Sequence, residues 1–406
     1  MKEKSAFQQF LEEDWEFRVR TDPFFATSTG DNRYNDRLPL VSEASFTDYL
    51  AALRGFEKRL SNLDIHSLTA AEKLDYEIYS RLLSNEIGLL GFKAYRMPIS
   101  KSSGFHIYFP ELYRQMPMAT EQDIANYIAR LSAFKQYAEG HIEIMRCGLV
   151  EGQIPPRVTM EGVLDSIDEQ LKKDLLESIF YTPMRELPAT ISASKATRLQ
   201  EDCAQAIRSS VMPGYASLRD FLEKEYIPNC RESIAASDLP GGREYYRQCI
   251  RHFTSLDLSP EEIHRVGLDH VVRIQAEMLA VCKQLGYESD LDALMQFMRT
   301  DPRFYAASPQ ELLEKTSLVL KRMDGELPGL FKTLPRLTYG IREIPTYAAP
   351  GSTTAYYQPG AGDGSRAGNY YVNTFDLKSR PFYEIEALSF HEAVPGHHLQ
   401  LALQQE

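Results

Sequence analysis

The sequence predicts a mainly α-helical protein with a small β-sheet or β-ribbon late in the chain. Two observations carry this prediction. Apolar residues recur at helical spacing through most of the chain, and a stretch rich in tyrosine, threonine, valine and isoleucine changes the pattern at about residues 335–375. The 406 residues include 43% hydrophobic and 25% charged side chains, as in ordinary globular proteins. At about 150 residues per domain, this length corresponds to two or three domains, which large helical proteins often merge into one body.

Three helix starts are the clearest local signals. Thr120 precedes Asp123 by three residues, as in a capping box, and the apolar residues that follow fall on one helical face: Ile124, Tyr127, Ile128, Leu131, Phe134 and Ala138. The segments that begin at Ser259 and Ser308 share a second pattern, with serine as N-cap, proline at the first helical position and glutamate three residues after the serine. Further helices are expected between residues 5 and 90 and around residues 196–235.

The β element is predicted from three short segments after Leu337, namely LTYGIREIPTYAA, TTAYYQP and NYYVNTF. A glycine-rich loop, PGAGDGSRAG, separates the second segment from the third. The helical pattern returns after Pro381 and extends to about residue 405. We therefore expect an N-terminal helical region over residues 1–240, and a second region over residues 241–406 that contains the β-ribbon and this last helix.

The charge balance argues against nucleic-acid partners. Lys and Arg total 45 and Asp and Glu total 57, which gives a net charge of −12. Nucleic-acid binding depends on basic side chains that neutralise phosphates, so we expect no nucleic-acid partner. The five cysteines form no CxxC pair, which favours reduced thiols over a disulfide framework.

The sequence contains no membrane or export signal. No apolar stretch approaches the roughly 18 residues of a transmembrane helix, and the N-terminal segment has no apolar core of a signal peptide. The expected location is therefore cytoplasmic for the chain as written. A secreted, periplasmic or lipoprotein form is expected instead if a signal peptide has been removed.

The strongest chemical signal is the decapeptide HEAVPGHHLQ, which begins at His391. In an HExxH zinc helix, two histidines four residues apart share one face, and the glutamate beside the first can hold the reacting water. Here the position four residues after His391 is Pro395. On a regular helix His397 would lie about 9 Å along the axis from His391, too far for both to bind one ion. Pro395 and Gly396 must kink or bulge the helix, and a two-residue bulge would return His397 to the place of the second histidine.

Two assignments of the second ligand remain possible. We prefer His397, because the Gly-His step matches the HExGH form of related zinc helices. His398 is the alternative, because seven residues are nearly two helical turns. If His397 is the ligand, His398 supports the site from behind or faces the substrate. The competing structural interpretation is a kinked helix whose histidines cap carbonyl groups or pack in a core. The combination of His-Glu with Pro-Gly-His-His-x-Gln favours the metal site.

The decapeptide resembles the signature of the DUF885 family, bacterial proteins that are similar to gluzincin-type zinc metallopeptidases. Three further blocks resemble the family: GDNRYNDRLP near residue 30, residues 242–278, and DGSRAGNYYVNTFDL at residues 363–377. The resemblance covers essentially the whole chain, with one departure at Ala367, where the family usually has proline. The family normally continues to a later helix with a Glu-Gly-Trp-type segment. The resemblance implies that this helix supplies the third metal ligand, so we expect the chain to be C-terminally incomplete and that ligand to lie downstream of residue 406.

The resemblance also implies a zincin-like helical body, Zn²⁺ as cofactor, and hydrolysis of peptide bonds. His391 and His397 would bind zinc as neutral imidazoles, and Glu392 would act as the general base that takes a proton from water and passes it to the leaving amine. The tyrosine-rich strand would hold an extended peptide by main-chain hydrogen bonds. Four residues are candidates to contact the substrate or the oxyanion, although packing is the commoner role of strand tyrosines: Arg366, Tyr370, Tyr371 and His398.

Two other functions stay open. One is a non-catalytic relative that binds a peptide or ligand with an incomplete zinc site, and the other is a metal-dependent amidase that acts on a non-peptide substrate. The expected partner is a peptide or a small amide, while the sequence predicts neither the oligomeric state nor a preference for one chain end. Glu384 lies about two turns before His391, too far for a direct ligand. If a ligand within the chain completes the site, Glu384 and Asp363 are the first positions to mutate.

Overall fold

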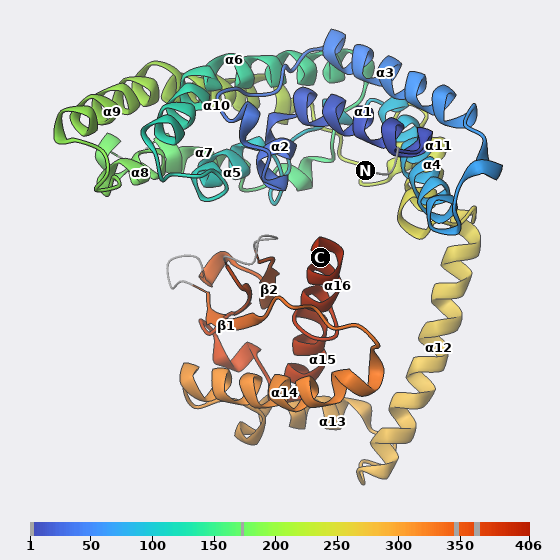
Figure 1. Cartoon of the computed structure of the whole chain (residues 1–406). Coiled ribbons are helices and arrows are strands. Elements are labelled where there is room, and N and C mark those ends of the chain that lie inside the picture. Colours follow the sequence, from blue (N-terminus) through green and yellow to red (C-terminus); the bar gives the residue numbers. More distant parts are fainter. Residues whose placement is uncertain (1–3, 172–173, 345–348, 361–365) are drawn as a thin grey trace. The chain divides into compact units, whose positions relative to one another are not determined.

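The computed structural model describes residues 4–171, 174–344, 349–360 and 366–406. Helices dominate, and the named strands of the described ranges form one small sheet, which confirms the predicted mainly α fold (Figure 1). The chain divides into two compact units, Met1–Arg265 and Val266–Glu406. This division falls inside α12 (Pro260–Gln284), whereas the sequence-based boundary lies at residues 240/241, just before α11 (Gly242–Thr254).

The first unit consists of α-helices joined by turns and by longer segments that contain short 3-10 helices. Besides α11 and the start of α12, its α-helices are α1 (Ala6–Thr21), α2 (Pro23–Thr29), α3 (Glu43–Ser61), α4 (Ala70–Gly91), α5 (Phe105–Tyr108), α6 (Glu121–Glu151), α7 (Val163–Leu171), α8 (Thr182–Arg185), α9 (Ala193–Ala206) and α10 (Met212–Phe221). None of the helices in the described ranges is both long enough and apolar enough to span a bilayer.

The predicted helix starts are confirmed. The Thr120 hydroxyl accepts a hydrogen bond from the backbone N–H of Asp123 at 3.1 Å, and the Asp123 carboxylate accepts one from the backbone N–H of Thr120 at 2.8 Å. Ser259 accepts from the N–H of Glu262 at 3.1 Å. Ser308 accepts from the N–H of Glu311 at 3.2 Å. These bonds satisfy backbone donors that have no partner inside the helix.

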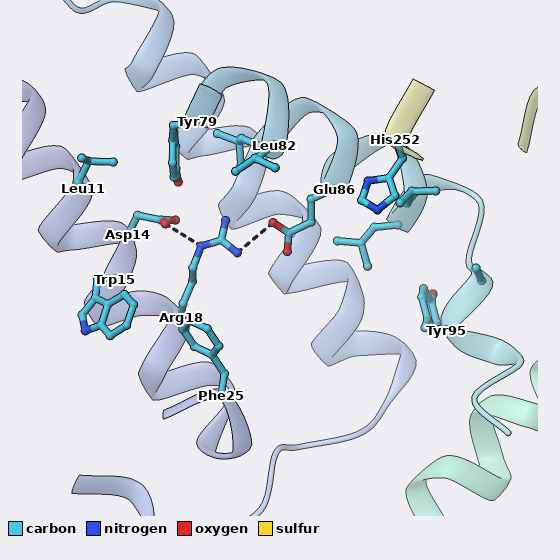
Figure 2. A pocket seen from close by; sticks show the side chains of 14 residues that line it. Leu11, Asp14, Trp15, Arg18, Phe25, Tyr79, Leu82, Glu86, Tyr95 and His252 are labelled. Carbon is cyan, nitrogen blue, oxygen red and sulfur yellow. Dashed lines mark hydrogen bonds and ion pairs between the residues drawn. The ribbon is translucent and has the colours of Figure 1, made fainter. Parts of the chain in front are cut away.

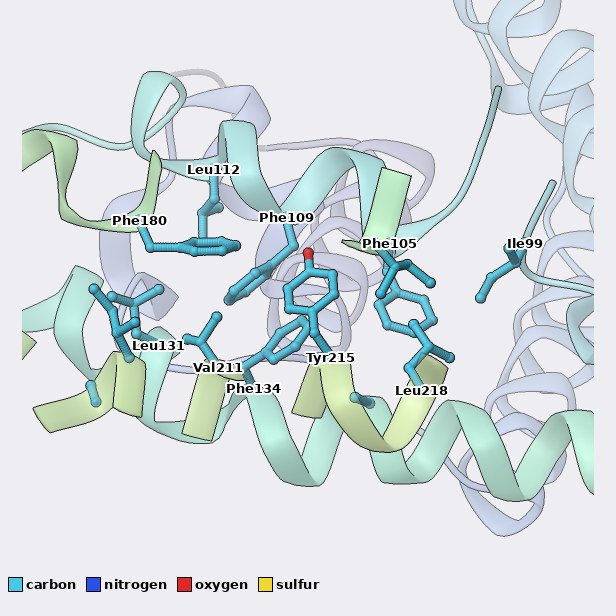
Figure 3. Close-up of a cluster of buried hydrophobic side chains, with 14 of the residues drawn as sticks. Ile99, Phe105, Phe109, Leu112, Leu131, Phe134, Phe180, Val211, Tyr215 and Leu218 are labelled. Carbon is cyan, nitrogen blue, oxygen red and sulfur yellow. The ribbon is translucent and has the colours of Figure 1, made fainter. Parts of the chain in front are cut away.

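The predicted apolar face of α6 forms the main core of the first unit. Aromatic rings from separate segments meet on it, as Figure 3 shows: the Phe134 ring lies 4.3 Å from that of Phe109 and 4.8 Å from that of Tyr215. Tyr127, Leu131 and Phe134 are at most 1% exposed. A separate cluster of buried apolar side chains joins α1, α3 and α4, and includes Phe10, Leu53, Phe56, Leu60 and Leu83.

The second unit packs helices against the small sheet. Its elements are α13 (Leu291–Thr300), α14 (Pro309–Leu330), β1 (Tyr339–Glu343), β2 (Ala355–Gln358), β3 (Gly368–Val372), α15 (Phe382–Glu392) and α16 (His397–Gln405). The strand order is β1-β3-β2, with β1 parallel and β2 antiparallel to β3. Tyr370 and Val372 of β3 share one buried cluster with Ile385 of α15, Leu399 of α16 and Leu320 of α14. The sheet therefore backs directly onto the two C-terminal helices.

The last helix differs from the prediction in one respect. The sequence predicts one helix over residues 381–405 with a bulge at Pro395-Gly396, whereas the structure has two helices, and α15 ends at Glu392 while α16 begins at His397. The backbone leaves helical angles at Ala393 (φ −109°, ψ −96°) and again at Gly396 (φ −80°, ψ −127°). The interruption is thus a complete break, after which the chain starts a new helix.

Candidate metal centre

Three side chains that can bind a metal come together where α15 ends and α16 begins. His391 and Glu392 are the last two residues of α15, and His397 is the first of α16. One ligand atom from each lies within 4.8 Å of those of the other two. The ring centroids of the two histidines are 4.7 Å apart, and Glu392 Oε2 lies 4.0 Å from His397 Nε2. The structure therefore brings together the three residues that the sequence analysis places at the metal.

The contact between the two helix ends depends on Gly396. A Cβ atom on Gly396 would overlap the carbonyl oxygen of His391 and lie 2.5 Å from that of Phe390. Only a residue without a side chain can approach the end of α15 so closely. Beyond it, the N–H of His398 donates to the carbonyl of Ala393 at 2.9 Å, which starts α16 beside the end of α15. His397 is thereby turned back toward His391.

The donor set fits a zinc ion. Zinc binds imidazole nitrogens and carboxylate oxygens at about 2.0–2.2 Å, so the donor atoms around one tetrahedral ion lie roughly 3.3 Å apart. Separations of at most 4.8 Å can close to that distance by rotation of the side chains. In the part of the chain that the structure describes, this is the one group of three or more such residues.

The exposure of the three side chains is uneven. His391 is exposed and the His397 side chain is 43% exposed, whereas Glu392 is only 9% exposed. The imidazoles therefore face solvent while the carboxylate lies beneath them. A site that is open on one side is typical of catalytic zinc, since structural zinc is closed by four protein ligands.

His398 occupies a different environment. It is 2% exposed, its Nδ1 lies 2.8 Å from the hydroxyl of Tyr357, and its ring packs against that of Tyr339 at 4.8 Å. Burial lowers the pKa of His398, so the imidazole is neutral near pH 7. Of the two roles expected for His398, its position agrees with support of the site from behind and not with contact to a substrate, because tyrosines of β1 and β2 cover the ring. Its contacts instead attach the start of α16 to the sheet.

The sequence analysis did not identify Tyr357. This residue lies on β2, and its side chain crosses β3 at Gly368, where a Cβ atom would overlap the tyrosine hydroxyl. Gly368 thus lets the Tyr357 hydroxyl reach His398, the neighbour of the candidate ligand His397. The only sequence signal for this contact is the last glycine of the predicted loop, directly before a predicted strand, where a small residue lets another group approach closely.

The remaining candidate substrate contacts go to three different places. Tyr370 is 1% exposed and lies near Ser389 and Glu392; burial and the Glu392 charge raise its pKa to about 12, although the Ser389 hydroxyl opposes the shift. Tyr371, the next residue on the strand, stacks on Tyr356 with ring centroids 4.9 Å apart. Alternate strand residues point to opposite faces, so Tyr371 faces away from Tyr370. Arg366 is exposed and donates to the carbonyl of Pro359 at 2.9 Å. Of the three, the structure places only Tyr370 beside Glu392.

The pairing of the strands argues against peptide binding along the tyrosine-rich strand. The tyrosine-rich segment NYYV lies in β3, the central strand, whose main-chain groups pair with β1 on one side and β2 on the other. A strand that is paired on both sides has no edge to offer an extended peptide. Only β1 and β2 have an unpaired side within the described sheet.

Glu384 lies in the first turn of α15 and is not part of the group of potential ligands, in agreement with the distance argument from the sequence. It borders a small cavity together with Arg380 and Tyr370. Asp363 lies outside the described residues.

Comparisons with known proteins agree with the fold. The model of a family described as bacterial proteins of unknown function (DUF885) matches residues 23–406. A candidate lipoprotein from Colwellia psychrerythraea has a crystal structure similar to this chain, with a TM-score of 0.89 and 22% identity, covering 98% of this chain and 73% of that one. A candidate lipoprotein of unknown function from Shewanella oneidensis has a TM-score of 0.62 and 16% identity, covering 98% and 72%. No protein of curated function matches the chain.

Proposed function

The chain belongs to the DUF885 family, and we propose that it is a zinc-dependent hydrolase of peptide bonds with His391 and His397 as metal ligands. The observation that carries the proposal is the group of two solvent-facing imidazoles above one buried carboxylate, with ligand atoms within 4.8 Å of one another. These residue types and this openness are typical of catalytic zinc sites.

Each side chain has a distinct task. His391 and His397, as neutral imidazoles, would hold the ion. A bound zinc ion would supply Lewis-acid chemistry, polarising a carbonyl and lowering the pKa of water. Glu392 takes one proton from the attacking water while the water oxygen bonds to the scissile carbon. It then delivers that proton to the amine nitrogen as the carbon–nitrogen bond breaks.

The surroundings favour a peptide or small amide as substrate. The outer edges of β1 and β2 have main-chain groups suitable for an extended segment. Tyr370 stays protonated at neutral pH, and because it is buried near Glu392 it supports that carboxylate instead of contacting the substrate. The lipoprotein description of both structural neighbours supports a secreted or lipoprotein form, one of the two locations expected from the sequence.

The test combines metal content with turnover. The purified chain is stripped with a chelator and titrated with zinc, and hydrolysis is followed on a panel of short peptides and non-peptide amides. We expect at least a tenfold loss of zinc affinity in His391→Ala and in His397→Ala. His398→Gln is the matched control, because His398 contacts Tyr357 instead of the metal group.

Three outcomes would change the proposal. Loss of zinc in the His398 variant but not in the His397 variant would reverse the ligand assignment. Zinc binding and peptide binding without turnover would indicate a non-catalytic relative. Turnover of simple amides but not of peptides would indicate an amidase.

A further inference from the structure

A second cavity lies in the first unit, within the helical region that carries none of the metal-centre residues. Its volume is about 740 Å³, which is in the range of small-molecule sites. One face of α4 forms a wall through Tyr79, Leu82, Leu83, Glu86, Leu89 and Leu90, which recur at three- and four-residue steps. The opposite wall comes from Leu11, Asp14, Trp15 and Arg18 of α1, as Figure 2 shows.

Most of the wall is apolar, but a polar network lies at its centre. Arg18 donates from Nε to Asp14 Oδ2 at 2.6 Å and from Nη1 to Glu86 Oε2 at 2.9 Å (Figure 2). The hydroxyl of Tyr49 donates to the second oxygen of Glu86 at 2.8 Å. Two carboxylates therefore face one guanidinium, and the charged side chains that line the cavity sum to one negative charge.

Two polar atoms of this network lack partners. Asp14 is 3% exposed, and its Oδ1 makes no hydrogen bond, nor does the buried hydroxyl of Tyr79. The two groups are neighbours and interact weakly: burial raises the pKa of Tyr79, and the pull of the Asp14 carboxylate on the tyrosine hydroxyl raises it further, although the two atoms do not meet the geometry of a hydrogen bond. A ligand that donates to both groups would replace this weak contact with two charge-assisted hydrogen bonds, so the pair favours a ligand that brings a charged hydrogen-bond donor.

We propose that this cavity is a binding site for a small organic cation, a primary amine on an aromatic or aliphatic body. The ammonium would donate to Asp14 Oδ1 and to the Tyr79 oxygen, and would match the single excess negative charge. The apolar body would lie against Trp15 and Phe25, whose rings meet edge to face at 5.4 Å, and against the leucines of α4. Trp15 and Leu82 are 40% and 58% exposed, so the cavity is accessible from solvent at these residues. The site is independent of the proposed hydrolysis.

Trp15 makes the proposal directly measurable, because it is the only tryptophan of the chain. The full chain is titrated with phenethylamine, phenethyl alcohol and phenylacetate while Trp15 fluorescence is recorded, and calorimetry is used to confirm each affinity. We expect saturable binding of the amine, with the alcohol about tenfold weaker and the acid weaker still, since a charged hydrogen bond contributes about that factor. Equal affinity for all three probes, or tighter binding of the acid, would overturn the proposal.

Substitutions at Asp14 and Tyr79 test where the ammonium group of the ligand binds. Asp14→Asn should bind the amine and the alcohol equally, whereas Glu13→Gln, which removes an exposed carboxylate next to it on α1, should bind like the parent chain. Since Asp14→Asn also weakens the Arg18 pair, Tyr79→Phe is a second test that removes only the hydroxyl beside Asp14 and leaves the Arg18 pair in place. It should fold normally and lower amine affinity several-fold. Unchanged amine affinity in a folded Tyr79→Phe, or unchanged preference for the amine in a folded Asp14→Asn, would refute the site. Glu392→Gln should leave amine binding intact, which separates this test from that of the hydrolase.

Discussion

Gly396 shows how one residue can bring two candidate metal ligands together. His391 and His397 are six positions apart, and only a backbone without a side chain can pass close enough to the end of α15 to bring them into contact. The sequence predicts both histidines and the glutamate correctly as neighbours, because their chemistry and the Pro-Gly step are local. It does not predict the pair of Tyr357 and His398, which lie 41 residues apart and meet only through the sheet.

We therefore predict that Gly396→Ala disrupts the site. The added methyl group must push α16 away from α15, which moves His397 from His391 and should lower zinc affinity at least tenfold. The strain should also cost about 1–3 kcal/mol of unfolding free energy. Zinc titration and denaturant unfolding measure both effects. Gly325→Ala in α14 is the control, since no atom would lie within 4 Å of its new Cβ. Normal zinc affinity in Gly396→Ala would remove the close approach from the explanation.

At the scale of elements, the sequence predicts the positions at which the secondary structure changes better than the structure found at those positions. The interruption at Pro395-Gly396 is predicted, but its form is a new helix instead of a bulge. Contacts of α16 with residues outside the motif favour that form. His398 forms a hydrogen bond with Tyr357 of β2. The Glu406 carboxylate accepts hydrogen bonds from the backbone N–H groups of Arg336 and Leu337 at 2.8 and 2.7 Å. Similarly, the tyrosine-rich strand is predicted, but its central place depends on pairing with residues 339–343 and 355–358, which no local pattern specifies.

A second element-scale feature is the fully buried Arg130 of α6. It donates to the carbonyls of Pro23 and Arg37 at 2.9 Å and to the Thr27 hydroxyl at 2.8 Å, and so attaches α2 and the segment after it to the core. Burial lowers its pKa to about 10, which still leaves it charged at neutral pH.

Arg130→Met should therefore destabilise the first unit by at least about 3 kcal/mol, because several buried acceptors lose a charged donor. Amide hydrogen exchange should accelerate first in residues 23–37. The exposed Arg54 of α3 gives the control variant, Arg54→Met, which should unfold like the parent chain. Equal unfolding midpoints for both variants would show that Arg130 does not stabilise this attachment.

At the scale of the whole molecule, the contact-defined division lies inside α12, which carries no compositional mark. A continuous amphipathic helix looks the same on both sides of such a division, so the sequence places its boundary at the nearest change of pattern.

Buried histidines make the stability of the whole molecule depend on pH. Two buried histidines of the first unit, His106 and His141, have ring nitrogens without hydrogen-bond partners. Burial lowers the pKa of His106 from 6.5 to about 4 and that of His141 to about 3.

These shifts predict acid sensitivity. Below pH 6.5 the histidines of the unfolded chain bind protons, whereas the buried histidines of the folded chain stay neutral. The free energy of unfolding therefore falls as the pH drops from 6.5, down to about pH 4 for His106 and about pH 3 for His141. Each histidine contributes roughly 1.4 kcal/mol per pH unit within its window. His141→Phe preserves a ring that stacks on Phe105 at 4.3 Å but cannot titrate.

The His141 variant should therefore lose about 2 kcal/mol less than the parent chain between about pH 6.5 and about pH 5, by urea unfolding at each pH. His66→Gln, at an exposed histidine, should behave like the parent chain. An identical loss of stability in His141→Phe would assign the acid sensitivity to other groups.

The most direct test of the metal-centre account is Glu392→Gln, assayed for zinc content and for turnover in the same preparation. The amide cannot accept a proton from water, so we predict the same zinc content as in the parent chain and hydrolysis slower by on the order of 10²–10⁴. Loss of zinc with the substitution would show that Glu392 is a ligand and not the base. Retained zinc with near-normal hydrolysis would contradict its role in the reaction altogether.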